Sequence, residues 1–281
     1  MAFNVNAKLP KISIIMPVFN GDLYLEQAIQ SVINQNYPDL EFIIIDGGST
    51  DTSLQIIEKY KDQINVVLSE KDFGLNHAVN KGILLSTGDY IGWLNSDDYY
   101  YENALIRIGD FLMKNPETGL IYGDAAHVDA NGNFLSWHEA IPFDKSKLLH
   151  VRDYIPCQAC FFKRAALAYI GLFDTNLKWC GDWDMWKRFA VSGKFKIEFI
   201  DEKIGAWRLH GNTITSGANS SKQMYLRAIE NFNSSRKYSE KLLSRIELVQ
   251  IPFMVVGFLG LRGFLKKIRD KFFVGHVESK N

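Results

Sequence analysis

Charge excess, long apolar runs and cysteines are all scarce in this 281-residue sequence, and each absence excludes a class of protein. Lysine plus arginine number 32, as do aspartate plus glutamate, so no net charge attracts nucleic acid or another acidic polymer. No apolar run reaches the roughly 18 to 20 residues that a membrane-spanning helix needs. The 23% of charged residues instead indicates a soluble globular protein with one substantial core and an appendage, or with two small domains.

The cysteines favour an intracellular protein without a zinc site. Their odd number, three, and the lack of a recognisable secretory leader favour the reducing cytoplasm. Cys157 and Cys160 have the spacing of half a zinc site or of a redox pair, but no second pair follows them. We therefore interpret these cysteines mainly as small buried side chains.

Apolar segments that alternate with helical patterns predict an α/β fold. Strands that are apolar on both faces belong to a parallel sheet covered by helices, and four segments fit this description: 12–19, 41–46, 65–70 and 90–94. An apolar stripe over 25–33 predicts a helix that stops before Pro38, and 54–60 predicts another, with Thr52 and Gln55 in the pattern of a capping box. After about residue 115 the pattern loosens into shorter strands and loops, and 222–250 is polar and helix-prone.

Polar clusters follow three of these strands, at the edge of the sheet where α/β proteins bind ligands. The clusters are 17–20, 46–51 and 95–98. Asn95-Ser96-Asp97-Asp98 places hard oxygen ligands at the end of a buried strand, as needed to hold Mg²⁺ or Mn²⁺ against a diphosphate, although the same residues are also ordinary turn and helix-start chemistry. A nicotinamide site would need Gly-x-Gly-x-x-Gly after the first strand, and that motif and a phosphate-binding P-loop are both absent.

In order and spacing, these segments resemble the family 2 glycosyltransferases with the GT-A fold, from about residue 10 to 215. The matching motifs are Pro17-Val-Phe-Asn20, Ile45-Asp46-Gly-Gly-Ser-Thr-Asp51, Ser69-Glu-Lys-Asp-Phe-Gly74, Asn80-Lys-Gly-Ile83, Thr87-Gly-Asp-Tyr-Ile91, Leu94-Asn-Ser-Asp-Asp98 and Gly181-Asp-Trp-Asp-Met-Trp186. The subgroup it resembles most is that of the bacterial surface-polysaccharide transferases.

The resemblance implies a fold and a domain organisation. It implies an α/β GT-A fold whose nucleotide-binding sheet is mostly parallel and flanked by helices. The transferase domain would cover 1–220, with a nucleotide-binding half at about 10–115 and an acceptor half at about 116–220. A helical C-terminal extension would cover 221–281.

The resemblance also implies a donor and metal site. Asp46 would accept hydrogen bonds from the uracil of the donor, and its alternative role is to cap the following turn. Asp97 would bind Mg²⁺ or Mn²⁺, and His210 would reach the metal or the diphosphate, with a purely structural histidine as the alternative. The implied nucleotide-sugar-binding residues are Pro17, Phe19, Asn20, Asp46, Asn80, Asn95 and Ser96.

Three positions depart from the family pattern. Asn95 stands at the position where the family usually has the first aspartate of an Asp-x-Asp motif. The loss of this carboxylate allows activity to depend less strongly on the metal ion. Val79 replaces an arginine found in many relatives, so metal, backbone N–H groups or Lys81 would have to meet the diphosphate charge. Gly181 replaces a common glutamate.

By the same resemblance, Asp182 is the catalytic base and Trp183 and Asp184 bind the acceptor. A carboxylate near the acceptor hydroxyl would draw off its proton as the oxygen attacks the anomeric carbon, with inversion. The donor would be a nucleoside-diphosphate sugar, favouring a UDP-sugar, and the acceptor a saccharide or a lipid-linked saccharide of a cell-surface polysaccharide. Two alternatives stay open, a nucleotidyltransferase and a catalytically silent subunit that binds sugar nucleotides or glycans.

The tail carries a further prediction. Residues 251–261 are strongly apolar, and 261–272 place apolar side chains on one helical face with basic ones elsewhere. This pattern is typical of a helix in a membrane interface, which would give a cytoplasmic enzyme peripheral contact with the inner face of the cell membrane. The alternative is a helix that packs on the catalytic domain or in a dimer.

Overall fold

The computed structural model describes residues 8–211 and 221–238, and it contains one nine-stranded sheet. The order of strands across the sheet is β3-β2-β1-β4-β8-β6-β9-β5, with β7 paired to β6. Their bounds are β1 Ile12–Val18, β2 Leu40–Asp46, β3 Val66–Ser69, β4 Tyr90–Trp93, β5 Tyr99–Tyr100, β6 Thr118–Val128, β7 Phe134–Trp137, β8 Cys160–Lys163 and β9 Lys196–Arg208. The four strands predicted from the apolar segments are β1 to β4.

The sheet is parallel in its N-terminal half and mixed beyond it. β1 pairs in parallel with β2 and β4, and β2 with β3. β8 then runs antiparallel to both β4 and β6, while β6 and β9 are parallel. The predicted parallel arrangement is therefore confirmed for the strands that precede the three polar clusters. The carboxyl ends of these strands lie at one edge of the sheet.

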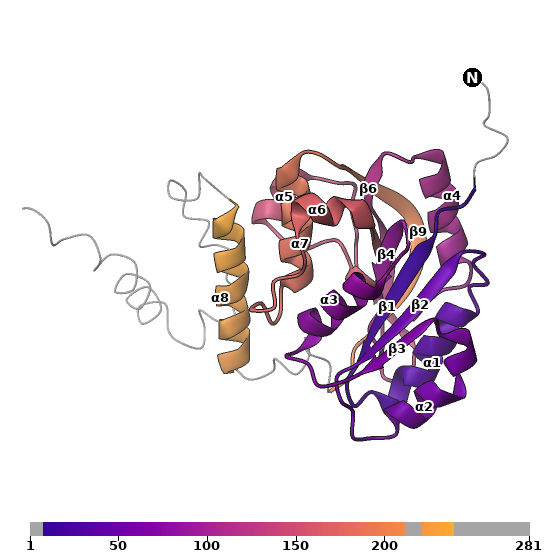
Figure 1. Ribbon diagram of the computed structural model, residues 1–281. Helices are drawn as coiled ribbons and strands as arrows, with labels where there is room; N and C mark the ends of the chain where they lie inside the picture. The colour runs from indigo at the N-terminus through magenta and orange to yellow at the C-terminus, as the bar shows by residue number, and fades with distance from the viewer. Residues whose placement is uncertain (1–7, 212–220, 239–281) are drawn as a thin grey trace, which may run out of the picture.

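Helices cover both faces of the sheet (Figure 1). α1 (Asp22–Ile33), α2 (Ser53–Lys59) and α4 (Ala104–Lys114) pack on one face, in a core that includes Leu25, Ile29 and Ile108. α3 (Leu75–Leu85), α5 (Lys145–His150), α6 (Leu167–Ile170) and α7 (Gly181–Ser192) pack on the other. Three short 3₁₀ helices complete the set: η1 Lys61–Gln63, η2 Cys157–Ala159 and η3 Arg164–Ala166.

The sequence patterns predicted where these helices lie, but they did not predict the hydrogen bonds at the helix ends. α1 ends at Ile33, ahead of Pro38, as its apolar stripe predicts. Thr52 is the N-cap residue of α2, but its side chain makes no capping bond. Its hydroxyl donates instead to Asp22 Oδ2, 2.8 Å away on α1, so the predicted capping box is wrong.

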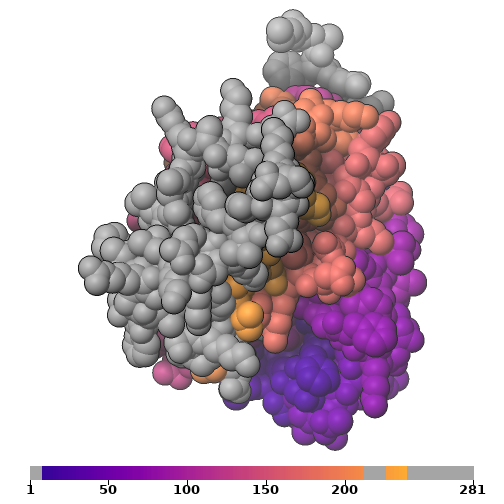
Figure 2. Space-filling view, turned by 90° about the vertical axis from the view of Figure 1, so that its left-hand side faces the viewer, coloured from indigo at the N-terminus to yellow at the C-terminus, as the bar shows by residue number. Residues whose placement is uncertain are grey.

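The polar stretch after residue 220 begins with α8 (Ser221–Lys237), which lies beside α7 (Figure 1). In the space-filling view, gold atoms of α8 lie next to salmon atoms, the colour of the region that includes α7 (Figure 2). Within residues 8–211 and 221–238, no helix is both long enough and apolar enough to cross a bilayer. The membrane prediction for 251–272 falls outside the described residues.

Candidate active site

The loops that follow β1, β2 and β4 are joined at the carboxyl edge of the sheet. The backbone N–H of Asn20 donates to Ser49 Oγ, and the backbone N–H of Thr50 donates to Asn20 Oδ1, both at 2.8 Å. Gly21 lies so close to Ser96 that a Cβ atom on it would be 2.8 Å from Ser96 Oγ. The three polar clusters predicted from the sequence therefore form one continuous surface.

The first cluster offers an exposed aromatic ring. Phe19 is 64% exposed at the end of β1, whereas Pro17 is buried within the strand. Asn20 has a φ of 49°, a left-handed conformation that asparagine tolerates better than most residues. Of the expected base-binding residues, Pro17 is thus buried in the strand, and the side chains of Phe19 and Asn20 reach the surface.

Asp46 is completely buried and bonded to the turn that follows it. Its carboxylate accepts hydrogen bonds from the backbone N–H groups of Gly48 and Ser49, at 3.1 and 3.2 Å, and from the hydroxyl of Ser69 at 2.6 Å. These contacts correspond to the turn-capping role, which was the alternative that the sequence left open for Asp46. The carboxylate fixes the shape of the turn at this carboxyl edge of the sheet.

Asn80 is occupied by the backbone of another segment. Its side-chain amide donates to the carbonyl oxygen of Phe173 at 2.8 Å and accepts from the N–H of Phe173 at 2.9 Å. One turn earlier, Asn76 donates to the carbonyl oxygens of Asp174 and Leu177. In this structure Asn80 thus holds the loop before α7, which differs from the expected contact with the donor.

Asp97 and His210 meet although 113 residues separate them in the sequence. Asp97 Oδ2 and His210 Nε2 are 3.0 Å apart, and the His210 ring lies 4.8 Å from that of Tyr24. Both predicted metal-binding side chains therefore present a donor atom at one point of the carboxyl edge.

Asp98 is a buried junction and neither caps a helix nor faces solvent. It accepts hydrogen bonds from Asn95 Nδ2 (3.1 Å), Gln158 Nε2 (2.8 Å) and the backbone N–H of Arg208 (2.9 Å). Burial raises the pKa of the Asp98 carboxyl well above its usual range, and the charge of Asp97 adds to this effect. Helix-start chemistry does not apply to Asp98, because the next helix, α4, begins only at Ala104 after Asn103.

Arg208 ties the two predicted metal-binding residues to the rest of the edge. It is buried at the end of β9, and its Nε donates to the backbone oxygen of Asp97 at 2.9 Å. Nη2 donates to Gln27 Oε1 at 2.6 Å, and the guanidinium lies 4.5 Å from the centre of the Tyr24 ring. Sequence reasoning singled out His210 and missed Arg208, which bonds to both Asp97 and Gln27.

Asp182 is the second residue of α7 and lies in a group of charged residues, of which Lys187 is fully buried and Asp182, Asp153 and Arg227 are partly buried. Burial raises the pKa of its carboxyl, while the backbone N–H groups of Trp183 and of Asp182 itself, and the charges of Arg227 and Lys187, act in the opposite direction. Burial likewise raises the pKa of Asp153 well above its usual range, and the charge of Asp182 raises it further. Sequence reasoning missed Asp153, because a single carboxylate outside any motif carries no signal.

The segment around η2 lies near both Asp182 and Asp98. Burial raises the pKa of the Cys157 thiol, and the next two causes are the charges of Asp182 and Asp98. Cys157 therefore lies near both carboxylates, and its neighbour Gln158 bonds directly to Asp98. The signal for Gln158 was available, since it is a polar residue in the apolar stretch 155–162. As expected, Cys160 and Cys180 are buried and free.

The two predicted acceptor-binding side chains have structural partners instead. Trp183 is 8% exposed, its indole N–H donates to the carbonyl oxygen of Leu148 at 2.7 Å, and Lys187 Nζ lies 3.4 Å from the centre of its ring. Asp184 is 1% exposed and accepts hydrogen bonds from Arg188 and Tyr238, at 2.9 and 2.8 Å. Neither side chain is open to a saccharide here. Trp186 is buried in the core, as expected.

Gly181 explains one departure from the family pattern. A Cβ atom at this position would lie 2.3 Å from Asn76 Nδ2, and the Asn76 amide is held by the two carbonyl oxygens that it contacts. A larger residue would force α7 away from α3. The glycine therefore permits the close approach of the helix that carries Asp182 to the helix that supports its loop.

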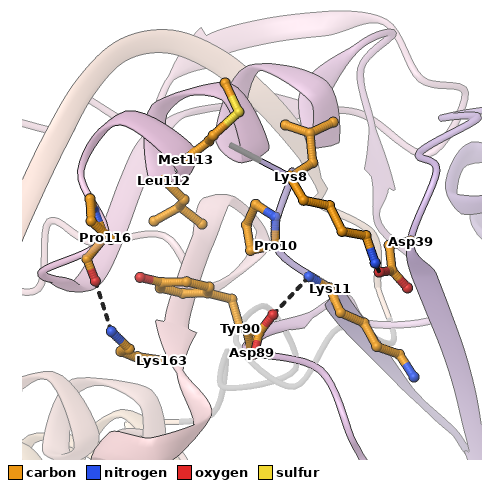
Figure 3. Close-up of a pocket in the computed structure, with 11 residues that line it drawn as sticks. Lys8, Pro10, Lys11, Asp39, Asp89, Tyr90, Leu112, Met113, Pro116 and Lys163 are labelled. Carbon is orange, nitrogen blue, oxygen red and sulfur yellow. Dashed lines mark hydrogen bonds and ion pairs between the residues drawn. The ribbon is translucent and has the colours of Figure 1, made fainter. Parts of the chain in front are cut away.

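A cavity of about 350 Å³ lies at the opposite edge of the sheet, where β1 and β4 begin (Figure 3). Lys8, Lys11 and Lys163 line it, and each is bonded to another lining residue. Lys8 pairs with Asp39, the N–H of Lys11 donates to Asp89, and Lys163 donates to the carbonyl oxygen of Pro116. None of the predicted site residues lies at this edge.

The donor atoms of Asp97 and His210 fit a divalent cation that the substrate helps to hold. Among the described residues, no group of three or more His, Cys, Asp or Glu side chains surrounds a common point. Mg²⁺ sites with substrate phosphates commonly use only one or two protein carboxylates. A carboxylate oxygen beside an imidazole nitrogen suits Mn²⁺ as well.

Sequence comparisons identify relatives. The family model described as Glycosyl transferase family 2 matches residues 13–168. An uncharacterized glycosyltransferase of Rickettsia prowazekii is 30% identical over 273 residues, which cover 93% of this chain and 82% of the relative. A PGL/p-HBAD biosynthesis glycosyltransferase of Mycobacterium tuberculosis is 32% identical over 179 residues, or 62% of this chain and 68% of the relative.

Solved structures share the fold. S. aureus TarS (residues 1–349), in complex with UDP-GlcNAc, superimposes with a TM-score of 0.61 and 19% identity over 95% of this chain and 76% of that one. The mannosyltransferase PcManGT from Pyrobaculum calidifontis, in complex with GDP-Man and Mn²⁺, gives 0.61 and 14% identity over 98% and 77%. The sheet and its covering helices are thus the GT-A arrangement expected from the sequence.

Proposed function

Because this chain belongs to glycosyl transferase family 2, we propose that it is an inverting enzyme that transfers a sugar from a UDP-sugar to an acceptor hydroxyl. The acceptor would be a saccharide or a lipid-linked saccharide in the synthesis of a cell-surface polysaccharide. The observation that carries this proposal is the meeting of Asp97 and His210, 3.0 Å apart, at the edge of the sheet that also holds Asn20, Asp46 and Asn95.

The carboxyl edge would hold the donor. The complexes of TarS with UDP-GlcNAc and of PcManGT with GDP-Man support a nucleoside-diphosphate sugar as the class of donor. The exposed ring of Phe19 suits stacking with the base, and Asn20 lies beside it. Asp46 would act through the turn that its carboxylate holds. Ser96 would face the nucleotide, as would Asn95, whose amide is held by Trp93 and Asp98. We leave Asn80 out of this set, because its amide bonds to the backbone of Phe173.

Asp97 and His210 would hold the Mg²⁺ or Mn²⁺ ion beside the diphosphate. When bound, such an ion neutralises the charge that develops on a diphosphate leaving group. Arg208 keeps the backbone of Asp97 in place through its hydrogen bond, and so orients the carboxylate.

Asp182 would act as the base. The oxygen of the acceptor hydroxyl attacks the anomeric carbon, the bond from that carbon to the β-phosphate oxygen breaks, and the hydroxyl proton passes to a carboxylate oxygen of Asp182. The products are the glycoside and UDP. Because burial raises the pKa of Asp182, its ionised form is a stronger base than an exposed aspartate.

The test compares products and binding. We expect purified protein with Mn²⁺, a saccharide acceptor and a panel of UDP- and GDP-sugars to release a nucleoside diphosphate, and to release no pyrophosphate when given a nucleoside triphosphate and a sugar phosphate. Asp97→Asn should weaken UDP binding in the presence of Mn²⁺ by about 10- to 100-fold in calorimetry, with little change without metal. Asp62→Asn, which alters an exposed carboxylate in η1, is the control.

Each other outcome identifies a different error. Pyrophosphate release from a nucleoside triphosphate and a sugar phosphate would indicate a nucleotidyltransferase. Binding of sugar nucleotides without transfer to any acceptor would indicate a silent binding subunit. Failure to bind any nucleoside diphosphate would overturn the donor assignment. The cytoplasmic location with peripheral membrane contact stays a prediction, since it depends on residues 251–272.

A further inference from the structure

The helix that carries Asp182 has no cap from the side chain of its N-cap residue. α7 begins at Gly181, and its N-cap residue, Cys180, makes no side-chain hydrogen bond to the first turn. The first backbone N–H groups of a helix lack partners within the helix and must find them elsewhere. Because Asp182 is the second residue of α7, the position of its carboxylate depends on what holds the segment 178–180.

Glu230, on α8, holds that segment. Its Oε1 accepts hydrogen bonds from the backbone N–H of Trp179 at 2.7 Å and of Cys180 at 2.9 Å. The N–H of Lys178 donates to Oε1 and Oε2, at 3.1 and 3.0 Å. A carboxylate at the start of a helix also interacts favourably with the helix dipole. Glu230 thus holds the three residues immediately before α7, including the N–H of its N-cap residue Cys180, from 50 positions away in the sequence.

Further contacts fix α8 against α7. Lys187 Nζ, which is fully buried, donates to the hydroxyls of Ser234 and Ser235 at 3.1 and 3.0 Å. The hydroxyl of Tyr238 donates to Asp184 Oδ1 at 2.8 Å. Glu230 and Ser234 are four residues apart, and positions with this spacing share one face of a helix. The polar face of α8 is therefore built to fit α7, and its orientation sets where Glu230 lies.

We propose that Glu230 is a positioning residue for Asp182, and that α8 is consequently part of the acceptor half of the enzyme. The proposal rests on the proposed function, in which Asp182 is the base. It extends the working enzyme beyond residues 13–168, which the family model matches, and beyond the boundary at residue 220 that the sequence suggested.

The experiment compares Glu230→Ala and Glu230→Gln in the full chain. We expect Glu230→Ala to lower kcat by about 10- to 100-fold, because small displacements of a catalytic group cost this much. The KM for the donor and the Kd for UDP should stay within about twofold, because the donor edge is untouched. Glu230→Gln should give an intermediate kcat, because its amide oxygen can still accept from Trp179 and Cys180. Arg236→Ala, at an exposed position of the same helix, is the matched control.

Hydrogen exchange provides a readout that does not depend on activity. Exchange of the backbone amides of 178–180 should be faster in Glu230→Ala than in the wild type, with Glu230→Gln between them. Wild-type kcat in Glu230→Ala, or an equal loss of kcat and of UDP affinity, overturns the proposal. If Glu230→Ala does not fold, Glu230→Gln decides, and wild-type kcat with wild-type exchange in that variant overturns the proposal as well.

The two proposals fail in different ways. If the wild type transfers no sugar, the proposed function is wrong, and the exchange data still show whether Glu230 holds 178–180. If Asp182→Asn remains active, the base assignment is wrong, and any loss of kcat in Glu230→Ala then has another cause, which overturns the positioning role.

Discussion

The carboxyl edge of the sheet, where we propose that the donor binds (the donor edge), and the region of α7 and α8, which we propose to position the base (the acceptor half), hold their carboxylates by different routes. Asp46 bonds to the backbone of Gly48 and Ser49, two and three residues further along the chain. The segment that precedes Asp182 is held by Glu230, 50 residues away, and Lys187 of the same helix bonds to Ser234, 47 residues away. A local turn thus shapes the surroundings of Asp46, whereas packing between distant helices shapes the surroundings of Asp182.

This difference predicts that substitutions in the two regions affect different steps. The donor edge should control nucleotide affinity, because its residues surround the expected place of the base and diphosphate. The acceptor half should control the rate of transfer, because it positions the base. Substitutions in α7 and α8 can separate these effects.

The largest expected effect is that of Asp182→Asn. Loss of a general base lowers rates by about 10²- to 10⁴-fold, so kcat should fall by this factor while the Kd for UDP stays unchanged. Steady-state kinetics and calorimetry on the same preparation measure both. An equal loss of UDP affinity would show that the two regions do not act separately.

Gly181→Ala tests the packing that the acceptor half requires. The added methyl group meets the fixed amide of Asn76, and such overpacking typically costs about 1 to 3 kcal/mol of unfolding free energy. Urea denaturation measures this change. Val191→Ala, at an exposed position of the same helix, should change stability by no more than about 0.5 kcal/mol. Equal stability of Gly181→Ala and the wild type would mean that α3 and α7 can separate at little cost.

The smallest expected effect is a shift of the pH profile in Arg227→Gln. Asp182 must be ionised to accept a proton. Burial raises its pKa, and the positive charges of Arg227 and Lys187 lower it, with Asp153 as the neighbouring carboxyl. Removing the charge of Arg227 therefore raises the pKa of Asp182.

The acid limb of kcat/KM should accordingly move to higher pH in Arg227→Gln, and Arg227→Lys should keep the wild-type profile. Rates measured across the acid limb at fixed ionic strength provide the comparison. A shift to lower pH, or the same shift in both variants, would contradict the assignment of this limb to Asp182.

The sequence could predict the donor edge because its signals are local. The buried strands β1 to β4 are visible as apolar runs, and the polar residues that follow each run must lie at one edge of a parallel sheet. It failed where a side chain had more than one possible partner. Thr52 bonds to α1 and leaves its own helix uncapped, and Trp183 turns its indole towards Leu148.

Residue types and their order along the chain thus determined the sheet, its covering helices and the polar edge, since periodicity and turn chemistry act over a few residues. Tertiary structure decided which distant groups meet: Asp97 with His210, Asp98 with Gln158, and Glu230 with the start of α7. These contacts depend on how helices and strands pack against one another. No local pattern encodes that packing, because each of these side chains would satisfy its hydrogen bonds equally well with other partners or with water.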